Sequence, residues 1–260
     1  MDGLRGSVAI VTGGGSGIGS AACLRLAREG CSVSVVGRHF DSVERTASAC
    51  RRESVRALAL EADVSERKAV RDAVSRTVDL FGRIDILVGN AGVVGPLSDV
   101  EDLDVGDWDL VFATNVRGMF LSVQACLPWM RQQGKGAIVL TGSNFGLVST
   151  PHSVLYTTSK GAVAALSRAL AVELVPDGIR VNCVCPGNVD TPMLDQALLV
   201  GGKDLDLAKR KLGRIATSDE IASAIAFLAS DEASYITGAH LVIDFGETSR
   251  PGPVWPSPSW

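Results

Sequence analysis

Tyr156 and Lys160 lie four residues apart, and Ser143 precedes the tyrosine by thirteen residues at the end of an apolar run. Residues i and i+4 of a helix share one face, so the Lys160 ammonium can lie beneath the Tyr156 phenol. A tyrosine keeps its proton to about pH 10, and a fixed cation lowers that pKa by favouring the phenolate. We therefore expect a proton-exchanging pair near neutral pH, with the Ser143 hydroxyl bonded to a substrate oxygen. Alone, such a pair is also typical of an ordinary surface helix.

A glycine-rich segment follows the first apolar run of the chain. Val8–Val11 predicts a short buried strand, and Thr12-Gly13-Gly14-Gly15-Ser16-Gly17-Ile18-Gly19 comes directly after it, ahead of a helical pattern. Glycines allow a tight turn and a close approach of the backbone to a pyrophosphate, which rests on the amides and the positive end of the helix. A glycine string could also be a plain loop, but in this position it predicts dinucleotide binding.

Strand and helix patterns alternate along the chain. The strand candidates are short continuous apolar runs, as in a parallel sheet covered on both faces: Val8–Val11, Val33–Val36, Ala57–Leu60, Ile84–Val88, Ala137–Leu140, Ile179–Val184 and His240–Ile243. The clearest helical patterns are Asp41–Arg52, Glu66–Leu80, Asp107–Arg131, Tyr156–Leu174 and Asp219–Ala229. Pro128 predicts a bend or an early stop in its helix, and Ser218-Asp219-Glu220 supplies polar capping residues to the last one. The alternation predicts the α/β fold class, with a Rossmann-type doubly wound parallel sheet of about seven strands.

The composition fits a single domain over residues 1–249. The chain has 260 residues, of which 46% are apolar, enough for a substantial core. Residues 250–260 break the pattern with repeated prolines. They predict an extended tail whose Trp255 and Trp260 are exposed or docked on a partner.

Charge and residue usage exclude several classes of function. A net charge of −4 gives no basic surface for nucleic acid or an anionic membrane. No apolar run approaches the roughly eighteen residues of a membrane span, and the first apolar stretch leads into the glycine turn, so we expect a cytoplasmic protein without a signal peptide. The three histidines are far apart in sequence, which predicts no catalytic metal. Cys183 and Cys185 share one face of a strand and are expected to be buried reduced thiols.

These residues resemble one family, the short-chain dehydrogenases/reductases, over nearly the whole chain. Thr12 through Gly19 is similar to that family's cofactor turn, Asp63 in Ala62-Asp63-Val64 to its adenine contact, and Asn90-Ala91-Gly92 to the motif after its fourth strand. Pro186-Gly187 resembles the segment that faces the nicotinamide. Gly89 departs from the pattern, because the family most often has a second asparagine there.

The resemblance implies an NAD(P)-dependent oxidoreductase that interconverts a secondary alcohol and a ketone. In the oxidation direction it makes Tyr156 the group that takes the hydroxyl proton, Ser143 the group that orients the oxygen, and Lys160 the cation that lowers the tyrosine pKa and holds the ribose. Asn115 would position a water that carries protons from Lys160 to solvent. Alternatively, Ser143 only ends a strand and Asn115 only forms a hydrogen bond with a helix turn. The implied cofactor contacts are Gly13, Ser16, Gly17, Ile18, Gly19, Arg38, Asp63, Val64, Asn90, Ala91, Gly92, Tyr156, Lys160, Pro186, Gly187, Val189 and Thr191.

The end of the second strand decides between NAD and NADP. A carboxylate there would bind the ribose 2′-hydroxyl of NAD, whereas an arginine would bind the 2′-phosphate of NADP. Gly37 stands where an acid is expected and Arg38 follows it, which favours NADP. NAD stays open, because NAD-using relatives also carry an arginine after their acid. Asp41 could reach the ribose, although capping the following helix is its simpler role.

Three segments would line the substrate pocket by resemblance: Val93–Leu97, Asn144–Leu155 and Asn188–Lys211. The expected substrate contacts are Ser143, Asn144, His152, Tyr156 and Asn188. The expected apolar residues beside them are Phe145, Leu147, Val148, Val154, Met193 and Leu194. This mixture favours a small secondary alcohol or ketone with a further polar group, although His152 could simply be a loop histidine.

Two other functions remain open at the level of sequence. One is a dinucleotide-binding sensor or scaffold without turnover, and the other is a dehydratase or epimerase that uses transient oxidation. Family members are commonly tetramers, so we expect a homotetramer or homodimer. Its contacts would involve the helices Asp107–Arg131 and Tyr156–Leu174, and around the second of these the apolar residues spread beyond one stripe.

Overall fold

Seven parallel strands form one sheet at the centre of the structure, a computed structural model that describes residues 1–200 and 214–249. The order across the sheet is β3-β2-β1-β4-β5-β6-β7. The strands are β1 (Val8–Thr12), β2 (Ser32–Gly37), β3 (Ala57–Glu61), β4 (Ile86–Gly89), β5 (Gly136–Thr141), β6 (Ile179–Pro186) and β7 (His240–Ile243). The predicted doubly wound parallel sheet is confirmed.

The direction of strand order reverses next to β1. This strand pairs with β2 on one side, where Thr12 lies opposite Val36, and with β4 on the other, where Val11 lies opposite Val88. In an open parallel sheet, ligands bind beyond the carboxyl ends of the strands at such a reversal. The glycine turn after β1 and the segment after β4 are therefore brought to one edge of the sheet.

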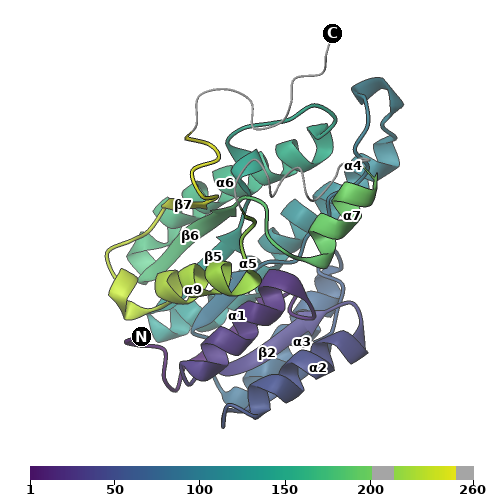
Figure 1. The fold of residues 1–260 in the computed structure, drawn as a ribbon. Helices are drawn as coiled ribbons and strands as arrows, with labels where there is room; N and C mark the ends of the chain where they lie inside the picture. Colours follow the sequence, from purple (N-terminus) through teal and green to yellow (C-terminus); the bar gives the residue numbers. More distant parts are fainter. Residues whose placement is uncertain (201–213, 250–260) are drawn as a thin grey trace.

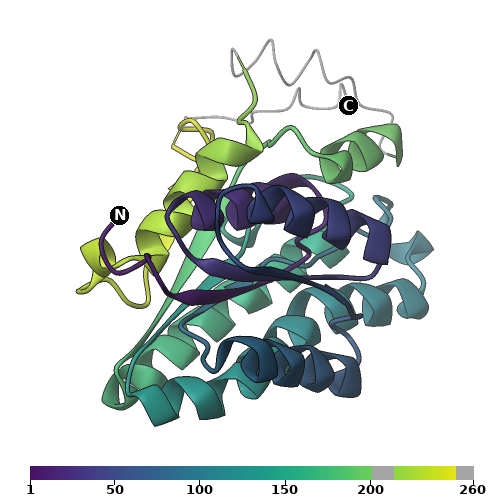
Figure 2. The ribbon, with the colours of Figure 1, turned by 90° about the horizontal axis from the view of Figure 1, so that it is seen from below.

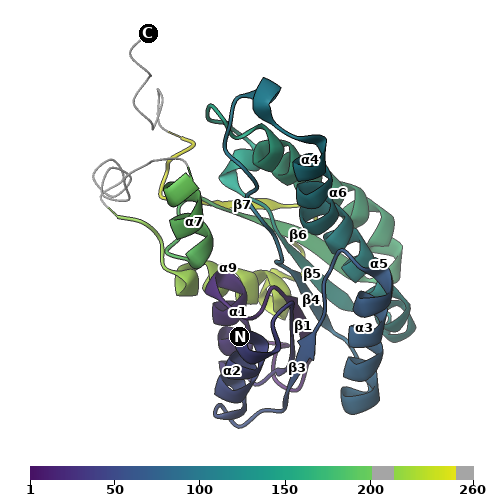
Figure 3. The same ribbon diagram turned by 90° about the vertical axis from the view of Figure 1, so that its right-hand side faces the viewer.

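Helices cover both faces of the sheet, as Figures 2 and 3 show. One face carries α1 (Gly17–Arg28), α2 (Phe40–Arg51) and α9 (Ser218–Ala229), and the other carries α3 (Arg67–Phe81), α5 (Gly118–Gln133) and α6 (Val154–Leu174). Successive side chains of a strand point to opposite faces, so each strand contributes to two cores. Val11, for example, packs in the core with the α9 residue Ile225, whereas Ile10 packs in the core with the α6 residue Val163.

The predicted helix Asp107–Arg131 is longer and less regular than expected. Helix α4 (Val105–Phe112) runs through a π-helical turn, Ala113–Arg117, directly into α5. The early stop predicted at Pro128 is wrong, because α5 continues to Gln133. Proline deprives the carbonyl four residues earlier of its partner. Here that residue, Gln124, is exposed like Pro128 itself, so its carbonyl can bond water.

The capping of two helices also differs from expectation. Thr217, one residue before the predicted start, caps α9, and its side chain and that of Glu220 form a reciprocal capping box. Asp41 lies in the first turn of α2, and no side-chain bond caps that helix. The predicted tail, residues 250–260, and residues 201–211 of the predicted substrate segment lie outside the described residues.

One helical stretch in the described part of the chain, Val105–Gln133, is long and apolar enough to cross a membrane by length and composition alone. No continuous apolar run marks this stretch in the sequence, because it includes polar residues. Half of the most apolar segment of this stretch is buried inside the protein, as in a core helix. Core helices can have the same length and apolar composition as a membrane span. The signal by itself does not indicate a membrane span.

Candidate active site

A cleft of about 470 Å³ opens beyond the carboxyl ends of β1, β4, β5 and β6. In Figure 1, α7 (Pro192–Val200) lies beside this edge of the sheet, to the right of β5 and β6. All but one of the seventeen residues predicted to contact the cofactor line the cleft, and the exception is Gly19. It lies behind the turn, where an added Cβ would be 2.1 Å from the Gly13 carbonyl oxygen. The turn therefore packs tightly on the start of α1, as a pyrophosphate site requires.

Asn90 connects the glycine turn to the segment after β4. Its side-chain amide donates to the carbonyl oxygen of Thr12 at 3.1 Å, and its backbone N–H donates to the Thr12 hydroxyl at 2.9 Å. Gly13 has a φ of +65°, and a Cβ there would lie 2.9 Å from the Cα of Ala91. Only glycine fits this approach without strain. These contacts hold the turn in the shape that a dinucleotide needs, so the residues fit that group.

Four residues after β2 form a cationic end to the cleft. Arg38, His39, Ser42 and Arg45 all line it. The sequence indicated only Arg38, and His39, Ser42 and Arg45 were missed. Ser42 and Arg45 are three residues apart on α2 and therefore share one face of that helix, so this spacing could have indicated Arg45. Asp41 is exposed and is not among the lining residues.

Asp63 lines the cleft near this cationic end and stays ionised. Its Oδ1 accepts from the Ser65 backbone N–H at 2.8 Å and from the Ser65 hydroxyl at 2.7 Å. Burial alone would raise the pKa of Asp63, but these hydrogen bonds and the nearby Arg38 and Arg117 guanidiniums bring it below its usual value.

Tyr156 and Lys160 lie on the first turns of α6 and face the same part of the cleft. The Lys160 Nζ is 5.6 Å from the centroid of the Tyr156 ring, and it donates to the carbonyl oxygen of Thr141 at 2.8 Å. Lys160 is almost fully buried, and this burial lowers its pKa to about 8. The ammonium therefore lies beneath the phenol as the spacing predicted.

The predicted lowering of the Tyr156 pKa is wrong for this structure. Desolvation by the surrounding protein raises the pKa of Tyr156 to about 12, and a hydrogen bond with Ser143 offsets only part of that rise. Burial disfavours the phenolate more than its neighbours favour it. At neutral pH the tyrosine is thus protonated.

Ser143 follows β5 and is 7% exposed. Its Oγ accepts from the backbone N–H of Phe145 at 3.1 Å, and its hydroxyl lies 3.2 Å from the Oδ1 of Asn144. The Phe145 ring meets the Tyr156 ring edge to face, with centroids 6.2 Å apart. Ser143 is therefore held beside Tyr156 from a different element of the fold.

Asn115 stands in the π-helical turn and is completely buried. Its Nδ2 donates to the Val93 carbonyl at 2.8 Å and to the Ser159 hydroxyl at 3.0 Å, while its Oδ1 accepts from the Val93 N–H at 2.8 Å. This side chain joins the segment after β4 to α6 and does not line the cleft. Its predicted role in holding a water stays a prediction.

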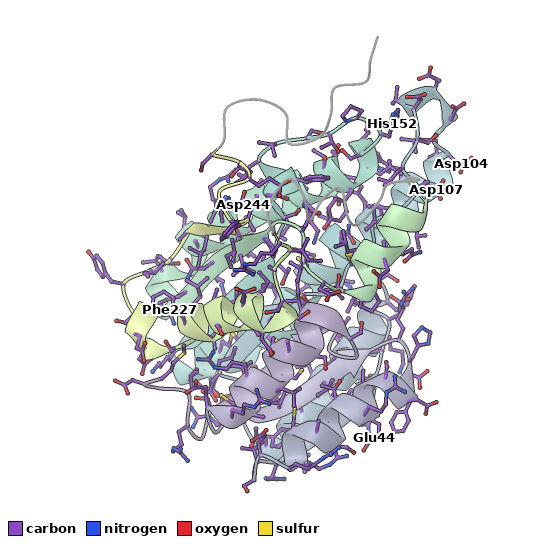
Figure 4. All side chains as sticks on the ribbon, in the orientation of Figure 1. Glu44, Asp104, Asp107, His152, Phe227 and Asp244 are labelled. Carbon is purple, nitrogen blue, oxygen red and sulfur yellow. The ribbon has the colours of Figure 1, made fainter. Side chains whose placement is uncertain are left out.

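The substrate side of the cleft combines amides with apolar side chains. Of the expected polar residues, Asn144 and Asn188 line it; of the expected apolar residues, Phe145, Met193 and Leu194 do. Leu147, Val148 and Val154 are exposed and do not. His152 does not line the cleft either; its Nδ1 is 3.0 Å from the Oδ1 of Asp99. In Figure 4 His152 lies at the rim of the molecule, far from Asp244.

A buried carboxylate next to the asparagines was missed. Glu247 is 5% exposed, and its Oε2 accepts from the Nδ2 of Asn144 at 3.2 Å and from the Nδ2 of Asn188 at 3.4 Å. It follows β7 in the segment Asp244-Phe245-Gly246-Glu247, which reads as a surface turn. No spacing in the sequence relates it to Ser143, so no local signal could have found it.

Comparison with known proteins decides the family. A family model described as enoyl-(acyl carrier protein) reductase matches residues 13–248, and many dehydrogenases and reductases match the chain along its length. The chain belongs to the short-chain dehydrogenase/reductase family. It resembles cis-4-hydroxycyclohexanecarboxylate dehydrogenase of Sinomonas cyclohexanicum, at 40% identity over 93% of this chain and 96% of that protein. It also resembles cyclopentanol dehydrogenase of a Comamonas species, at 39% identity over 96% of this chain and 100% of that protein.

A solved structure shares the architecture of this short-chain dehydrogenase/reductase. NAD⁺-bound xylitol dehydrogenase superposes with a TM-score of 0.89 at 33% identity, over 93% of this chain and 99% of that one. The protein is thus an oxidoreductase that interconverts an alcohol and a ketone with a nicotinamide dinucleotide.

The cysteines of this enzyme are free thiols in the described residues. The sulfur atoms of Cys183 and Cys185 lie 3.8 Å apart in the buried core. A hydrogen bond with Cys185, together with burial, raises the pKa of the Cys183 thiol. Within residues 1–200 and 214–249, no three histidine, cysteine, aspartate or glutamate residues are grouped so as to hold a metal ion.

Proposed function

We propose that this enzyme is an NADP-dependent dehydrogenase of compact secondary alcohols, with Tyr156 as its general acid and base. The observation that carries the proposal is the meeting of Ser143, Tyr156 and Lys160 at one end of the cleft, beside the apolar side chains of Phe145 and Met193. A mostly apolar pocket with a few converging polar groups suits a small ring or short chain that carries one reacting hydroxyl. The two relatives named for cyclic alcohols support this substrate class.

The chain's own residues control the proton and the position of the oxygen. In the oxidation direction Tyr156 takes the hydroxyl proton as the phenolate, after it has released its own proton, and Ser143 donates a hydrogen bond to the same oxygen. Lys160, charged at neutral pH with a pKa of about 8, stabilises negative charge on the phenol. The glycine turn that includes Gly13 would hold the dinucleotide's pyrophosphate and Pro186-Gly187 would face its nicotinamide, which would supply the hydride chemistry.

NADP is preferred in this proposal because of the cationic end of the cleft. A 2′-phosphate carries negative charge and accepts several hydrogen bonds, and Arg38, His39 and Arg45 all line the cleft there. Ser42 adds a hydroxyl, and among the residues that the structure describes Asp63 is the only carboxylate that lines the cleft. The hydroxyl pair of an NAD ribose would lack its usual acidic partner.

We also propose a homotetramer in the cytoplasm. Leu110 of α4 and Phe120 of α5 are 54% and 43% exposed, and both line a shallow apolar groove with Leu166 of α6. On the edge strand, Leu241 and Val242 of β7 are also exposed. Two apolar faces of this kind suit two different two-fold contacts. Free thiols in all six cysteines favour a reducing compartment.

Tyr156→Phe tests the proposal directly. The change removes the proton carrier and keeps the ring, so kcat for cyclopentanol oxidation should fall by at least about a hundredfold while the dissociation constant of the nucleotide changes little. Tyr235→Phe is the matched control, because the chain has two tyrosines and Tyr235 is fully exposed. Half of the wild-type turnover in the Tyr156 variant would refute the assignment. Product without a change in nicotinamide absorbance would indicate a dehydratase or epimerase.

A further inference from the structure

Two side-chain amides on the substrate side of the cleft share one buried partner. Asn144 and Asn188 both line the cleft, and each donates from Nδ2 to the Oε2 of Glu247, at 3.2 Å and 3.4 Å. The three residues follow three different strands, β5, β6 and β7. Three loops therefore meet at one carboxyl group, which itself lies behind the surface that a substrate touches.

A structured turn holds Glu247 in this place. The carboxylate of Asp244, labelled in Figure 4, accepts from the Thr248 N–H at 2.8 Å. The turn packs on Gly187, where an added Cβ would lie 3.0 Å from the Glu247 Oε2. Asn188 is the next residue along the chain, so the same packing fixes its backbone. The positions of both partners of this hydrogen bond are thus set by the fold.

Asn188 has an acceptor to offer to a substrate. Its Nδ2 is directed at Glu247, so Oδ1, the other end of the amide, is turned away and makes no hydrogen bond within the described part of the chain. Asn144 differs, because it is only 3% exposed and its Oδ1 lies 3.2 Å from the Ser143 hydroxyl. Asn188 is less buried. The acceptor of this cluster that is open to the cleft is therefore the Asn188 Oδ1.

An acceptor of this kind suits a substrate group that has a proton to give. A hydroxyl donates to an amide oxygen and can also accept from the second hydrogen of Nδ2. A carboxylate has no proton to give, and an ammonium group would share the cleft with the Lys160 ammonium. We propose that Asn188, braced by Glu247, binds a second hydroxyl of the substrate, so that the enzyme prefers compact diols. The inference rests on the proposed function and narrows its substrate class.

The substrate preference of wild-type protein is the first test. A ring without a second hydroxyl would cover the Asn188 oxygen and leave it unpaired, and sites of this kind discriminate against analogues that lack the hydroxyl. We expect kcat/KM for one of the 1,2- or 1,3-cyclopentanediols to exceed that for cyclopentanol by roughly tenfold. Two equivalent hydroxyls alone account for at most about a twofold difference, so a preference no larger than that would overturn the inference. Turnover of none of these compounds would overturn the proposed substrate class and the inference with it.

Asn188→Leu removes the acceptor and keeps the approximate size of the side chain. The ratio of kcat/KM for the preferred diol to that for cyclopentanol should fall to about two or less, mainly through a higher KM for the diol. Asn188→Ala is the second variant, in case leucine disturbs the loop. A ratio that stays at the wild-type value in both variants would refute the assignment of the second hydroxyl to Asn188.

Glu247→Leu tests the brace, because the Asn188 amide can turn once its partner is lost. This change should lower the same ratio in wild-type protein and have little further effect on it in the Asn188→Leu background. Glu247→Gln keeps an oxygen acceptor and should retain most of the preference. Glu232→Leu, at an exposed glutamate, is the matched control. Additive losses of preference in the double variant would overturn the positioning role of Glu247.

Discussion

Burial of Lys160 predicts a specific dependence of stability on pH. The pKa of this lysine is about 8 in the folded protein and 10.5 as its ordinary value. Below pH 8 both states hold the proton, and the folded state bears the full cost of a buried charge. Between pH 8 and pH 10.5 the folded protein has released the proton and the unfolded chain still binds it, so the free energy of unfolding rises with pH.

Lys160→Met removes this dependence and provides the test. With those two pKa values, wild-type protein should gain about 2 kcal/mol between pH 7 and pH 9.5 relative to the variant. Other titrating groups are common to both proteins and cancel in the difference, and the lost bond to Thr141 adds a largely constant offset. Urea unfolding without added nucleotide at a series of pH values measures it.

The matched control is Lys68→Met, because Lys68 is 88% exposed. Its difference from wild type should be flat over the same range. A difference between wild type and Lys160→Met that is also flat, or that falls with pH, would refute the conclusion that burial dominates the energetics of this lysine.

Two further predictions follow from the cofactor end and the exposed helices. Arg38→Ala should raise the dissociation constant of NADP by about 10- to 150-fold and that of NAD far less, since charge-assisted bonds are lost; calorimetry that finds wild-type protein binding NAD more tightly would contradict this. Phe120→Glu should lower the sedimenting mass of the assembly, whereas Leu80→Glu, at a similarly exposed residue of α3, should not. An unchanged mass for the Phe120 variant would exclude a contact through α5.

Local patterns were sufficient to place the strands and the glycine turn. Each strand was predicted within two residues at either end, because a strand covered on both faces is mostly apolar along its length and turns bound it. The glycine turn was equally clear, since its spacing reflects contacts within one short segment. Pro128 was misjudged because its effect depends on whether Gln124 can reach water, which the sequence does not state.

The residues that were missed act across the sheet. His39 and Arg45 reach the cleft only because α2 begins beside the glycine turn. Glu247 meets Asn144 over a separation of 103 residues, through the pairing of β5, β6 and β7. Such meetings depend on strand order, and a single sequence gives strand order only by resemblance to a family.

The pKa of Tyr156 shows why spacing alone misleads about chemistry. Position i+4 predicted a cation beneath the phenol, and the cation is there, but the same packing that places Lys160 also removes water from both groups. Burial lowers the pKa of the lysine and raises that of the tyrosine, so each charge is costly in the folded protein. A protonated Tyr156 is ready to give its proton to a ketone. In the reverse direction Tyr156 can take the hydroxyl proton only after it has released its own, so we expect the charge of Lys160, which favours the phenolate, to matter most there.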